Sequence, residues 1–316
     1  MSQTIAAFHR CPRCGNENPA GSFACNFCGF RLKIERIEKI RYFKRHEEEW
    51  IKPYPWYLKI FYLFINVPKA FWDINHKRSK SPGIYILLFS SLLYGVMGLA
   101  IFSHFNFPGN TLTKFVYNLS FFISWFVFGF TFQLIYWAVL IWLFTKGANY
   151  AVGFSQRLET RFGGLKDTQE KYSEAEISPF SIYKGGTMLQ LEGSYKFQMM
   201  LCAFTPFLLI NAIKSLIALV ALPTINLPVF GPLDLIFGPW DPVAIDNILD
   251  IMFNSGVWAM FDVLDGLTIA IWVPILMTIA IRELSNSSTT RVLIPNIIIG
   301  VLVAILFYFL RSTILG

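Results

Sequence analysis

Long apolar stretches, separated by shorter polar segments, occupy most of the chain after residue 80. A helix that crosses a bilayer needs about 20 predominantly apolar residues. The pattern therefore predicts an all-α polytopic membrane protein with five transmembrane helices within residues 81–316. Prolines inside the last three stretches predict kinks, because neighbouring helices can satisfy the freed backbone carbonyl groups. The five predicted spans lie at residues 83–102, 115–144, 197–222, 257–281 and 292–310.

A shorter apolar segment precedes these stretches at residues 55–74. Its unbroken apolar part before Pro68 is about twelve residues long and contains Lys59, so it is too short to span a bilayer. Aromatic and basic residues on an apolar helix favour the headgroup layer. We expect one or two interfacial helices within residues 55–80, hinged at Pro68; the alternative is a buried helix of a soluble core. The flanking aromatic residues are Trp56, Tyr57, Tyr62 and Trp72.

Charged residues are few and unevenly placed. They make up 15% of the chain, against about 25% in soluble domains. Residues 1–80 contain fifteen Lys and Arg and residues 145–196 contain seven, whereas residues 223–256 contain none. Because basic residues concentrate in cytoplasmic segments, we expect the N-terminus in the cytoplasm and the C-terminus on the opposite side. The polar N-terminus, which lacks the apolar core of a secretory signal, agrees with this orientation.

Two long polar connections lie between the predicted spans. Residues 150–190 are polar and interrupted by glycine, so we expect the second helix to continue briefly into water and then give way to a loop. Residues 223–256 contain four aspartates and are rich in Pro, Gly and apolar residues. We expect this second connection to pack on the outer membrane face as a cap.

Four of the five cysteines lie near the N-terminus with the spacing C-x2-C-x10-C-x2-C. Two such pairs can converge on one tetrahedral ion, and four thiolates leave no open position for water, so the spacing predicts a structural zinc site. Gly15 and Gly29 follow the second cysteine of each pair, where glycine can adopt a positive φ without strain. The alternatives are two disulfides, which suit secreted domains, or iron. The predicted zinc ribbon covers residues 8–33, with the ligands Cys11, Cys14, Cys25 and Cys28.

A basic connector, residues 34–54, follows the ribbon. Within residues 31–50, apolar and polar residues alternate at first, as in a closing strand of the ribbon. Ile37, Ile40 and Phe43 then follow a helix-like spacing. The basic side chains could contact anionic lipid, at about 1 kcal/mol each near the surface, or RNA, or an acidic protein. The alternative is a solvated connector without a partner.

Ionisable residues inside two of the predicted spans form a candidate intramembrane cluster. Lys214 follows Asn211 by one turn in the third span, and Asp262 and Asp265 share one helical face of the fourth. A charge at mid-bilayer is unfavourable by roughly 2.5–3.5 kcal/mol, so we predict an ion pair of Lys214 with Asp262 or Asp265. Such a pair could set the register of two helices, or bind an ion, a proton or a lipid headgroup. Otherwise Lys214 extends to the interface and the aspartates face water.

Catalytic motifs are missing from the sequence. It contains no G-x-x-x-x-G-K phosphate loop, no H-E-x-x-H and no G-x-S-x-G. Cys202 lies in the third span and is expected to behave as a small apolar residue. We therefore expect a protein that is not an enzyme, and no small-molecule substrate is predicted.

Several segments together resemble a known membrane-protein family. "CPRCGNENPAGSFACNFCGFRL" is similar to zinc-ribbon modules at the N-termini of prokaryotic membrane proteins. "VPKAFWDI", "GSYKFQMMLCAFTPFLLINAI" and "IAIWVPILMTIAIREL" resemble, in order and spacing, the Yip family of five-span proteins that interact with Rab-type GTPases. The resemblance covers residues 64–312. It implies a non-enzymatic role in membrane organisation, trafficking or protein recruitment.

Two functions follow from these features as expectations. The first is a membrane adaptor, in which the cytosolic zinc ribbon recruits a cytosolic protein or ribonucleoprotein to the bilayer, with a homo-oligomer as one possible assembly. The second is a transporter or channel subunit that uses Lys214, Asp262 and Asp265.

Overall fold

The computed structural model describes most of the helical chain. The described residues are 9–18, 22–25, 28, 30–46, 52–76, 81–106, 111–162, 193–226 and 255–309. The expected loop after the second helix and most of the expected cap at residues 223–256 lie outside them.

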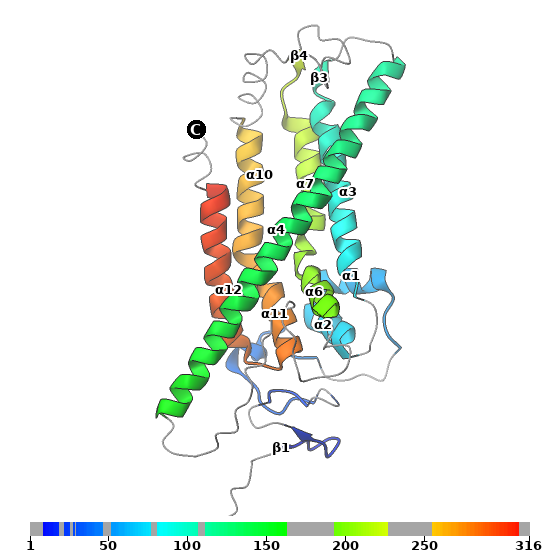
Figure 1. Ribbon diagram of the computed structural model, residues 1–316. Coiled ribbons are helices and arrows are strands. Elements are labelled where there is room, and N and C mark those ends of the chain that lie inside the picture. The colour runs from blue at the N-terminus through cyan, green and yellow to red at the C-terminus, as the bar shows by residue number, and fades with distance from the viewer. Residues whose placement is uncertain are drawn as a thin grey trace, which may run out of the picture. The chain divides into compact units, whose positions relative to one another are not determined.

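Four helices in these ranges are long and apolar enough to cross a membrane (Figure 1). The first two are α3 (Gly83–Phe102) and the Lys114–Ala151 part of α4 (Thr111–Phe162). The third, Gly256–Ser285, comprises α10 (Gly256–Leu267), the π-helical segment η3 (Thr268–Trp272) and α11 (Val273–Ser285). The fourth, Thr289–Tyr308, comprises α12 (Thr289–Ala304) and most of the π-helical segment η4 (Ile305–Phe309). Helix α4 continues beyond its apolar part, as expected from the sequence. These helices indicate an integral membrane protein.

The third predicted span is broken. Helix α6 (Gly193–Leu201) passes through the short 3-10 segment η2 (Cys202–Phe204) into α7 (Pro206–Ala221), and the two parts are bent by 41°. Pro206 begins α7, where its missing backbone N–H and fixed φ suit the first turn of a helix rather than its interior. The described residues therefore contain four candidate spans, or five if the bent pair counts as one. The prediction of five spans is confirmed only to that extent.

The other two prolines have different effects. Pro274 lies in the first turn of α11, directly after the wider turn of η3. Proline has no backbone N–H, so it cannot donate a regular helical hydrogen bond at this position. Local π-helical turns accommodate such a missing bond in transmembrane helices. Pro295 lies inside α12 without ending it.

The segment before the spans forms two short helices, α1 (Trp56–Ile65) and α2 (Val67–His76). The break falls at Asn66, with φ −142° and ψ 71°, and not at Pro68, so the predicted hinge position was wrong. Pro68 is the second residue of α2, where no intrahelical donor is needed. Lys59, which interrupts the apolar pattern, is buried and reaches Asp73 at 3.6 Å, so it joins α1 to α2.

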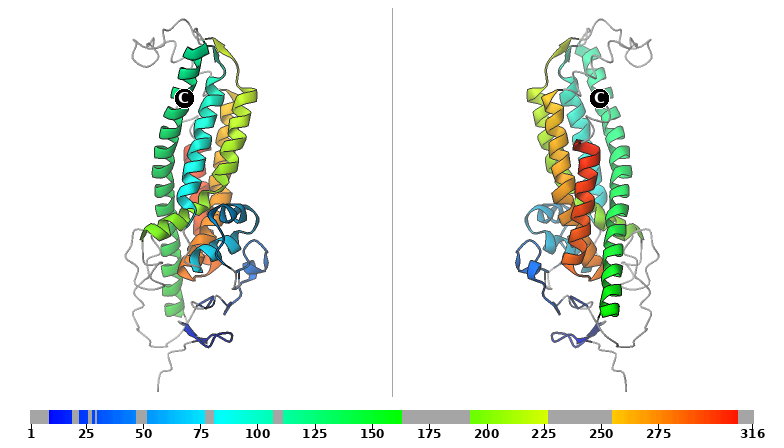
Figure 2. Two further views of the ribbon diagram at one scale, coloured as in Figure 1. Left: turned by 90° about the vertical axis from the view of Figure 1, so that its right-hand side faces the viewer. Right: turned by 90° about the vertical axis from the view of Figure 1, so that its left-hand side faces the viewer.

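Contacts between residues divide the chain into two compact units. Unit 1 contains residues 1–84, 138–205 and 270–301, and unit 2 contains residues 85–137, 206–269 and 302–316. In unit 1, α2 packs against α11 and α6 (Figure 2). The helix α1 beside it exposes four apolar side chains: Trp56, Tyr57, Phe61 and Ile65.

Unit 2 has its own apolar core between α3, α7 and α10. A short parallel pair, β3 (Phe105–Asn106) and β4 (Ile225–Asn226), follows α3 and α7. The buried core residues are Met97, Ala100, Ile101, Phe105, Ala218, Val257 and Phe261.

The N-terminal part of unit 1 contains the cysteines. Strands β1 (His9–Arg10) and β2 (Glu17–Asn18) pair antiparallel, and Ala24 bridges to Arg31. The only helical part of the connector among the described residues is the single 3-10 turn η1 (Arg36–Lys39), so the predicted connector helix was wrong.

Candidate functional site

The four N-terminal cysteines converge as predicted. Their sulfur atoms all lie within 4.8 Å of one another, and the Cys11–Cys28 and Cys14–Cys25 sulfurs are each 3.6 Å apart. A tetrahedral zinc ion with bonds of about 2.3 Å places its sulfur ligands roughly 3.8 Å apart. The two sulfur atoms of a disulfide are only about 2.05 Å apart. None of the four cysteines forms a disulfide. The cysteines could therefore hold a metal ion, and the disulfide alternative is excluded in this structure.

Tight backbone turns bring each cysteine pair together. The Gly15 N–H donates to the carbonyl of Cys11 at 2.9 Å, and Gly15 has a φ of +72°, as its place after the cysteine pair predicted. A Cβ at this φ would be strained, which explains the glycine. In the second pair, the Cys25 N–H donates to the carbonyl of Phe30 at 2.8 Å. Gly29 lies outside the described residues.

Sequence reasoning missed Asn18, which supports the cysteine cluster from β2. Its side chain is buried, and its amide group donates to the Cys25 sulfur at 3.5 Å and to the Asn16 carbonyl at 3.0 Å. An N–H group directed at a sulfur stabilises a metal-bound thiolate and fixes its orientation. Burial raises the pKa of the Cys28 thiol to about 12, so a metal ion must displace the proton on binding.

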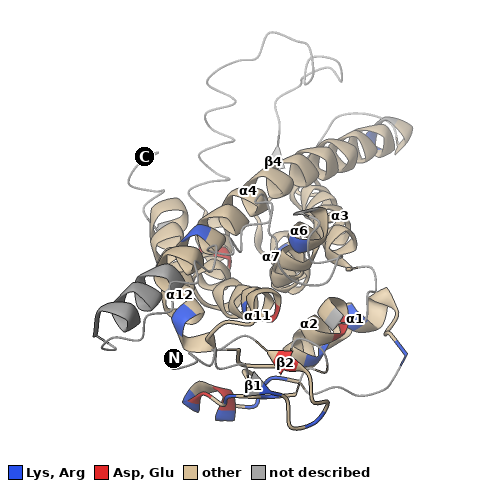
Figure 3. Cartoon of the chain, turned by 60° about the horizontal axis from the view of Figure 1, so that its bottom comes forward, with Lys and Arg blue, Asp and Glu red and all other residues tan. Residues whose placement is uncertain are grey.

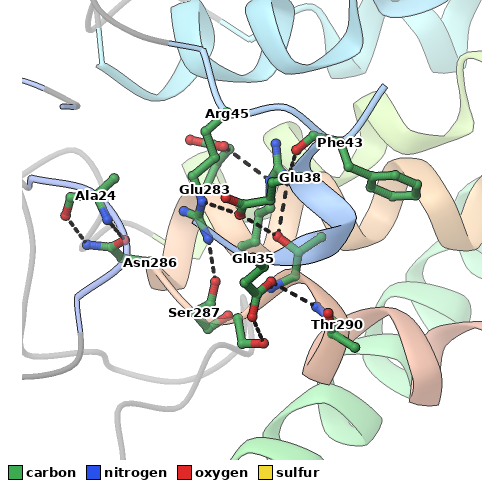
Figure 4. Close-up of polar contacts among 12 residues, drawn as sticks. Ala24, Glu35, Glu38, Phe43, Arg45, Glu283, Asn286, Ser287 and Thr290 are labelled. Atoms are coloured by element: carbon green, nitrogen blue, oxygen red, sulfur yellow. Dashed lines mark hydrogen bonds and ion pairs between the residues drawn. The ribbon is translucent and has the colours of Figure 1, made fainter. Parts of the chain in front are cut away.

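The cysteine cluster is attached to the turn between α11 and α12 through Asn286. The Ala24 N–H donates to Asn286 Oδ1 at 2.9 Å, and Asn286 Nδ2 donates to the Ala24 carbonyl at 2.7 Å (Figure 4). Asn286 ends α11 in the left-handed conformation, with φ 50°, which asparagine tolerates better than most residues. Because Ala24 directly precedes Cys25, this turn holds the backbone next to a metal ligand.

Glu35 of the connector binds the N-terminus of α12. Its carboxylate accepts hydrogen bonds from the Ser288 hydroxyl, from the Thr289 N–H at 2.8 Å and from the Thr290 N–H at 3.3 Å (Figure 4). The first N–H groups of a helix have no partner within the helix, and negative charge is favourable there. Glu35 therefore caps a helix that begins 254 residues later in the chain.

Four buried charges lie beneath these contacts. Glu38 and Arg45 are 1% and 3% exposed and pair at 2.8 Å, and Arg45 also donates to the Ser287 carbonyl at 2.6 Å. Arg282, which is fully buried, donates to the Phe43 carbonyl and reaches Glu283 at 3.3 Å. The group contains two charges of each sign, so it adds no net charge to the interior.

These contacts explain why the described part of the connector forms no helix longer than η1. The Phe43 carbonyl accepts from Arg282, and the acidic side chains bond to the α11–α12 turn. Phe43 is buried, whereas Ile40 is 56% exposed and so does not belong to one apolar helix face with it. The described connector is therefore docked on the α11–α12 turn, whereas its basic side chains Arg36, Lys39 and Arg41 stay exposed. We call the contacts of Ala24, Glu35, Glu38 and Arg45 with residues 286–290 the clasp.

The predicted ion pair of Lys214 is formed with Asp265 in unit 2. Lys214 Nζ lies 3.0 and 2.9 Å from the two carboxylate oxygens of Asp265, and Lys214 is only 4% exposed. Lys214 therefore does not extend to the interface. Asp262 lies one turn earlier on the same helix. Asn211 instead donates to the Ser90 hydroxyl of α3 at 3.0 Å, so it does not join Lys214.

Two aromatic rings of unit 2 lie near this ion pair, and the sequence analysis did not associate them with it. Lys214 Nζ lies 5.9 Å from the ring centre of Tyr94 and 6.0 Å from that of Phe261. The hydroxyl of Tyr308 donates to that of Tyr136 at 3.2 Å. The ring contacts stabilise the ammonium group in an otherwise apolar region.

Comparisons with known proteins add no assignment. No protein-family model matches this sequence. No curated protein is significantly similar to it, and no solved structure matches it. The resemblance to the Yip family stays a prediction.

Proposed function

We propose that this protein is a membrane adaptor, in which a cytosolic zinc ribbon binds a macromolecular partner and is held at the bilayer by the candidate spans. The clasp is the observation that supports this proposal. It connects the backbone beside Cys25 to the turn that joins Gly256–Ser285 and Thr289–Tyr308. A ribbon fixed in this way presents its exposed face in a constant orientation, which favours binding because less freedom is lost.

Zinc is the proposed metal. Four sulfur ligands at these distances suit tetrahedral Zn²⁺, and a site with four protein ligands is structural rather than catalytic. When bound, zinc would supply most of the folding free energy of the small ribbon, on the order of 10–16 kcal/mol as apparent binding free energy. No residue of the site is assigned a catalytic role.

The proposed orientation places the ribbon in the cytoplasm and the C-terminus on the opposite side, as the distribution of Lys and Arg favours. This arrangement keeps the thiols in a reducing compartment. The resemblance to the Yip family would add a role in membrane organisation, trafficking or recruitment. The proposed partner is a cytosolic protein or ribonucleoprotein.

Crosslinking in native membranes tests the recruitment proposal. The full chain and a Cys25→Ser, Cys28→Ser variant are each crosslinked, solubilised and analysed for retained proteins and RNA. Cys202→Ala is the matched control, because Cys202 is buried in the α6–α7 segment and is no ligand of the cluster. We expect the wild type and the control to retain the same partner and the double variant to lose it. The same partners on all three proteins would contradict the proposal.

A second function, transport, is favoured by one specific group of features. Lys214 and Asp265 pair inside candidate spans, and both spans are interrupted, one at η2 and one at η3. Interrupted helices beside intramembrane charges are typical of substrate or ion sites in transporters. The test is flux of protons or small ions into liposomes that contain the full chain. Flux that is lost in Asp265→Asn and kept in Asp262→Asn would support transport, and no flux in the wild type would exclude these substrates.

A further inference from the structure

In the described parts of the ribbon and connector, most basic side chains are exposed, whereas most acidic side chains are not. Among the described residues of 10–46, seven basic side chains are exposed, whereas Glu17 is the one exposed acid. Glu35 and Glu38 point inward to the clasp, as the preceding contacts show. Five of the exposed basic residues, Lys33, Arg36, Lys39, Arg41 and Lys44, form what we call the basic face. The acidic residues Glu47, Glu48 and Glu49 follow the connector and lie outside the described residues.

Docking to the α11–α12 turn produces this separation. The two acids in the described part of the connector, Glu35 and Glu38, bond to hydroxyl or N–H groups of that turn or to the buried Arg45. No hydrogen bond or ion pair within the described part of the chain involves the side chains of Arg36, Lys39 or Arg41. In Figure 3 the long helices are mostly uncharged, and Lys and Arg, together with some Asp and Glu, lie near β1 and β2 as well as on α1, α2, α4 and α6. Among the described residues, the basic face therefore carries an excess of positive charge.

The clasp also ties the connector to the turn between two candidate spans. It binds residues 286–290, which join the two candidate spans Gly256–Ser285 and Thr289–Tyr308. A short turn between two spans lies where both helices leave the hydrocarbon region. Glu35 contacts that turn directly, and the basic residues are its close neighbours in the chain. At physiological salt, charges interact over about 8 Å, so basic residues held beside such a turn can reach headgroup charges.

The side chains around the basic face favour lipid over RNA. Ile34 and Ile40 are 65% and 56% exposed between the basic residues. Apolar side chains among basic ones suit the boundary of headgroups and acyl chains. Single-stranded RNA is commonly bound by exposed aromatic rings on which bases stack, and no aromatic side chain in the described part of residues 10–46 is exposed.

We propose that the basic face binds anionic phospholipid headgroups of the bilayer that contains the protein's own spans. The phosphates of the lipid pair with Arg36, Lys39 and Arg41 in particular, and Ile34 and Ile40 contact the upper acyl region. The inference rests on the membrane placement of the α11–α12 turn and not on recruitment of a cytosolic partner. It gives the connector a binding role of its own, in addition to that of the metal site.

Lipid titration of the detergent-solubilised full chain tests the proposal. The probes are dioctanoyl phosphatidylglycerol, dioctanoyl phosphatidylcholine, inorganic phosphate and a 20-nucleotide uridine RNA, each measured by calorimetry at physiological salt. We expect phosphatidylglycerol to bind at least tenfold more tightly than phosphatidylcholine or free phosphate. In the triple variant Arg36→Gln, Lys39→Gln, Arg41→Gln, its affinity should fall roughly 100-fold, because each basic residue near an anionic surface contributes about fivefold.

A charge-conserving variant is the matched control. Arg36→Lys, Lys39→Arg, Arg41→Lys keeps the three charges and should retain phosphatidylglycerol affinity within threefold. Hydrogen exchange locates the contact: the amides of residues 33–44 should exchange more slowly in nanodiscs with phosphatidylglycerol than in pure phosphatidylcholine. Equal phosphatidylglycerol affinity of the wild type and the glutamine variant would overturn the proposal. RNA binding that is lost in this variant, without selective lipid binding, would replace it with a nucleic-acid surface.

Failure of this test is separate from failure of the adaptor proposal. Recruitment of a cytosolic partner can be measured in phosphatidylcholine nanodiscs, where anionic lipid is missing. A wild-type protein that binds its partner there, but does not select phosphatidylglycerol, would contradict only the lipid inference.

Discussion

Removal of the Arg45 side chain tests whether the clasp holds the connector. In Arg45→Ala the carboxylate of Glu38, which is 1% exposed, loses its 2.8 Å partner and stays in a buried site. Breaking a buried ion pair in this way destabilises by about 3–5 kcal/mol. Thr289 still donates to Glu38 at 2.9 Å, so we expect a value near the lower end of that range. The loss should appear in local opening of the connector rather than in unfolding of the whole chain.

Hydrogen exchange measures this opening directly. The reporter amides are those of Phe43 and Lys44, which both donate to the Ile40 carbonyl at 3.0 Å. A loss of about 3 kcal/mol corresponds to exchange roughly 150-fold faster, since 1.4 kcal/mol is tenfold. Lys44→Ala is the control, because this exposed neighbour takes no part in the ion pair, and it should change exchange less than threefold.

A double substitution separates the ion pair from general damage. Glu38→Gln with Arg45→Met removes both charges at similar volume, and such replacements are far less destabilising than loss of one partner. Its reporter amides should exchange at least tenfold more slowly than those of Arg45→Ala. If Arg45→Ala accelerates exchange less than tenfold, or no more than the double variant does, the reasoning about the buried pair is wrong.

Three further predictions address the metal, the Asn286 contact and the intramembrane pair. Elemental analysis of the full chain should find one zinc ion per molecule, lost in Cys25→Ser and kept in Cys202→Ala; iron, or metal that persists in Cys25→Ser, would contradict the assignment. In Asn286→Gly the glycine can adopt the left-handed backbone, but two hydrogen bonds to Ala24 are lost. Each bond contributes about 1 kcal/mol, so the Ala24 amide should exchange roughly 30-fold faster. An unchanged exchange rate would show that the contact is not made. Asp265→Ala leaves Lys214 buried without its carboxylate and should lower stability in detergent by about 3 kcal/mol, more than Asp262→Ala does; equal effects on the thermal midpoint would contradict the pairing with Asp265.

Apolar length and cysteine spacing predicted the main elements because these signals are local. A run of about 20 apolar residues has few alternatives to a spanning helix, and α3 begins and ends at the predicted residues, Gly83 and Phe102. The cysteine pairs also converged as their spacing indicated. The break near Pro206 was predicted as a kink but is a 41° bend, which leaves open whether this stretch is one span.

The clasp could not be predicted, because its partners lie more than 240 residues apart in the chain. The pattern of Ile37, Ile40 and Phe43 suggested a helix, but it carries no information about where the acidic side chains bond. Once Glu35 caps α12 and the Phe43 carbonyl accepts from Arg282, the connector follows the turn instead of its own helical pattern. The hinge moved from Pro68 to Asn66 for a related reason, since proline suits the first turn of α2.

Hydrogen exchange of the reconstituted full chain, with and without its metal, tests most directly whether the cysteine ribbon is joined to the membrane-spanning helices. Removal of the metal by a chelator should accelerate exchange in the described part of residues 10–46 and also in the α11–α12 turn at residues 285–290, because that turn loses Ala24 and Glu35 as fixed partners. Exchange in α3 and α10 of unit 2 should stay unchanged. Faster exchange in the ribbon alone, with residues 285–290 unaffected, would contradict the attachment on which the adaptor proposal depends.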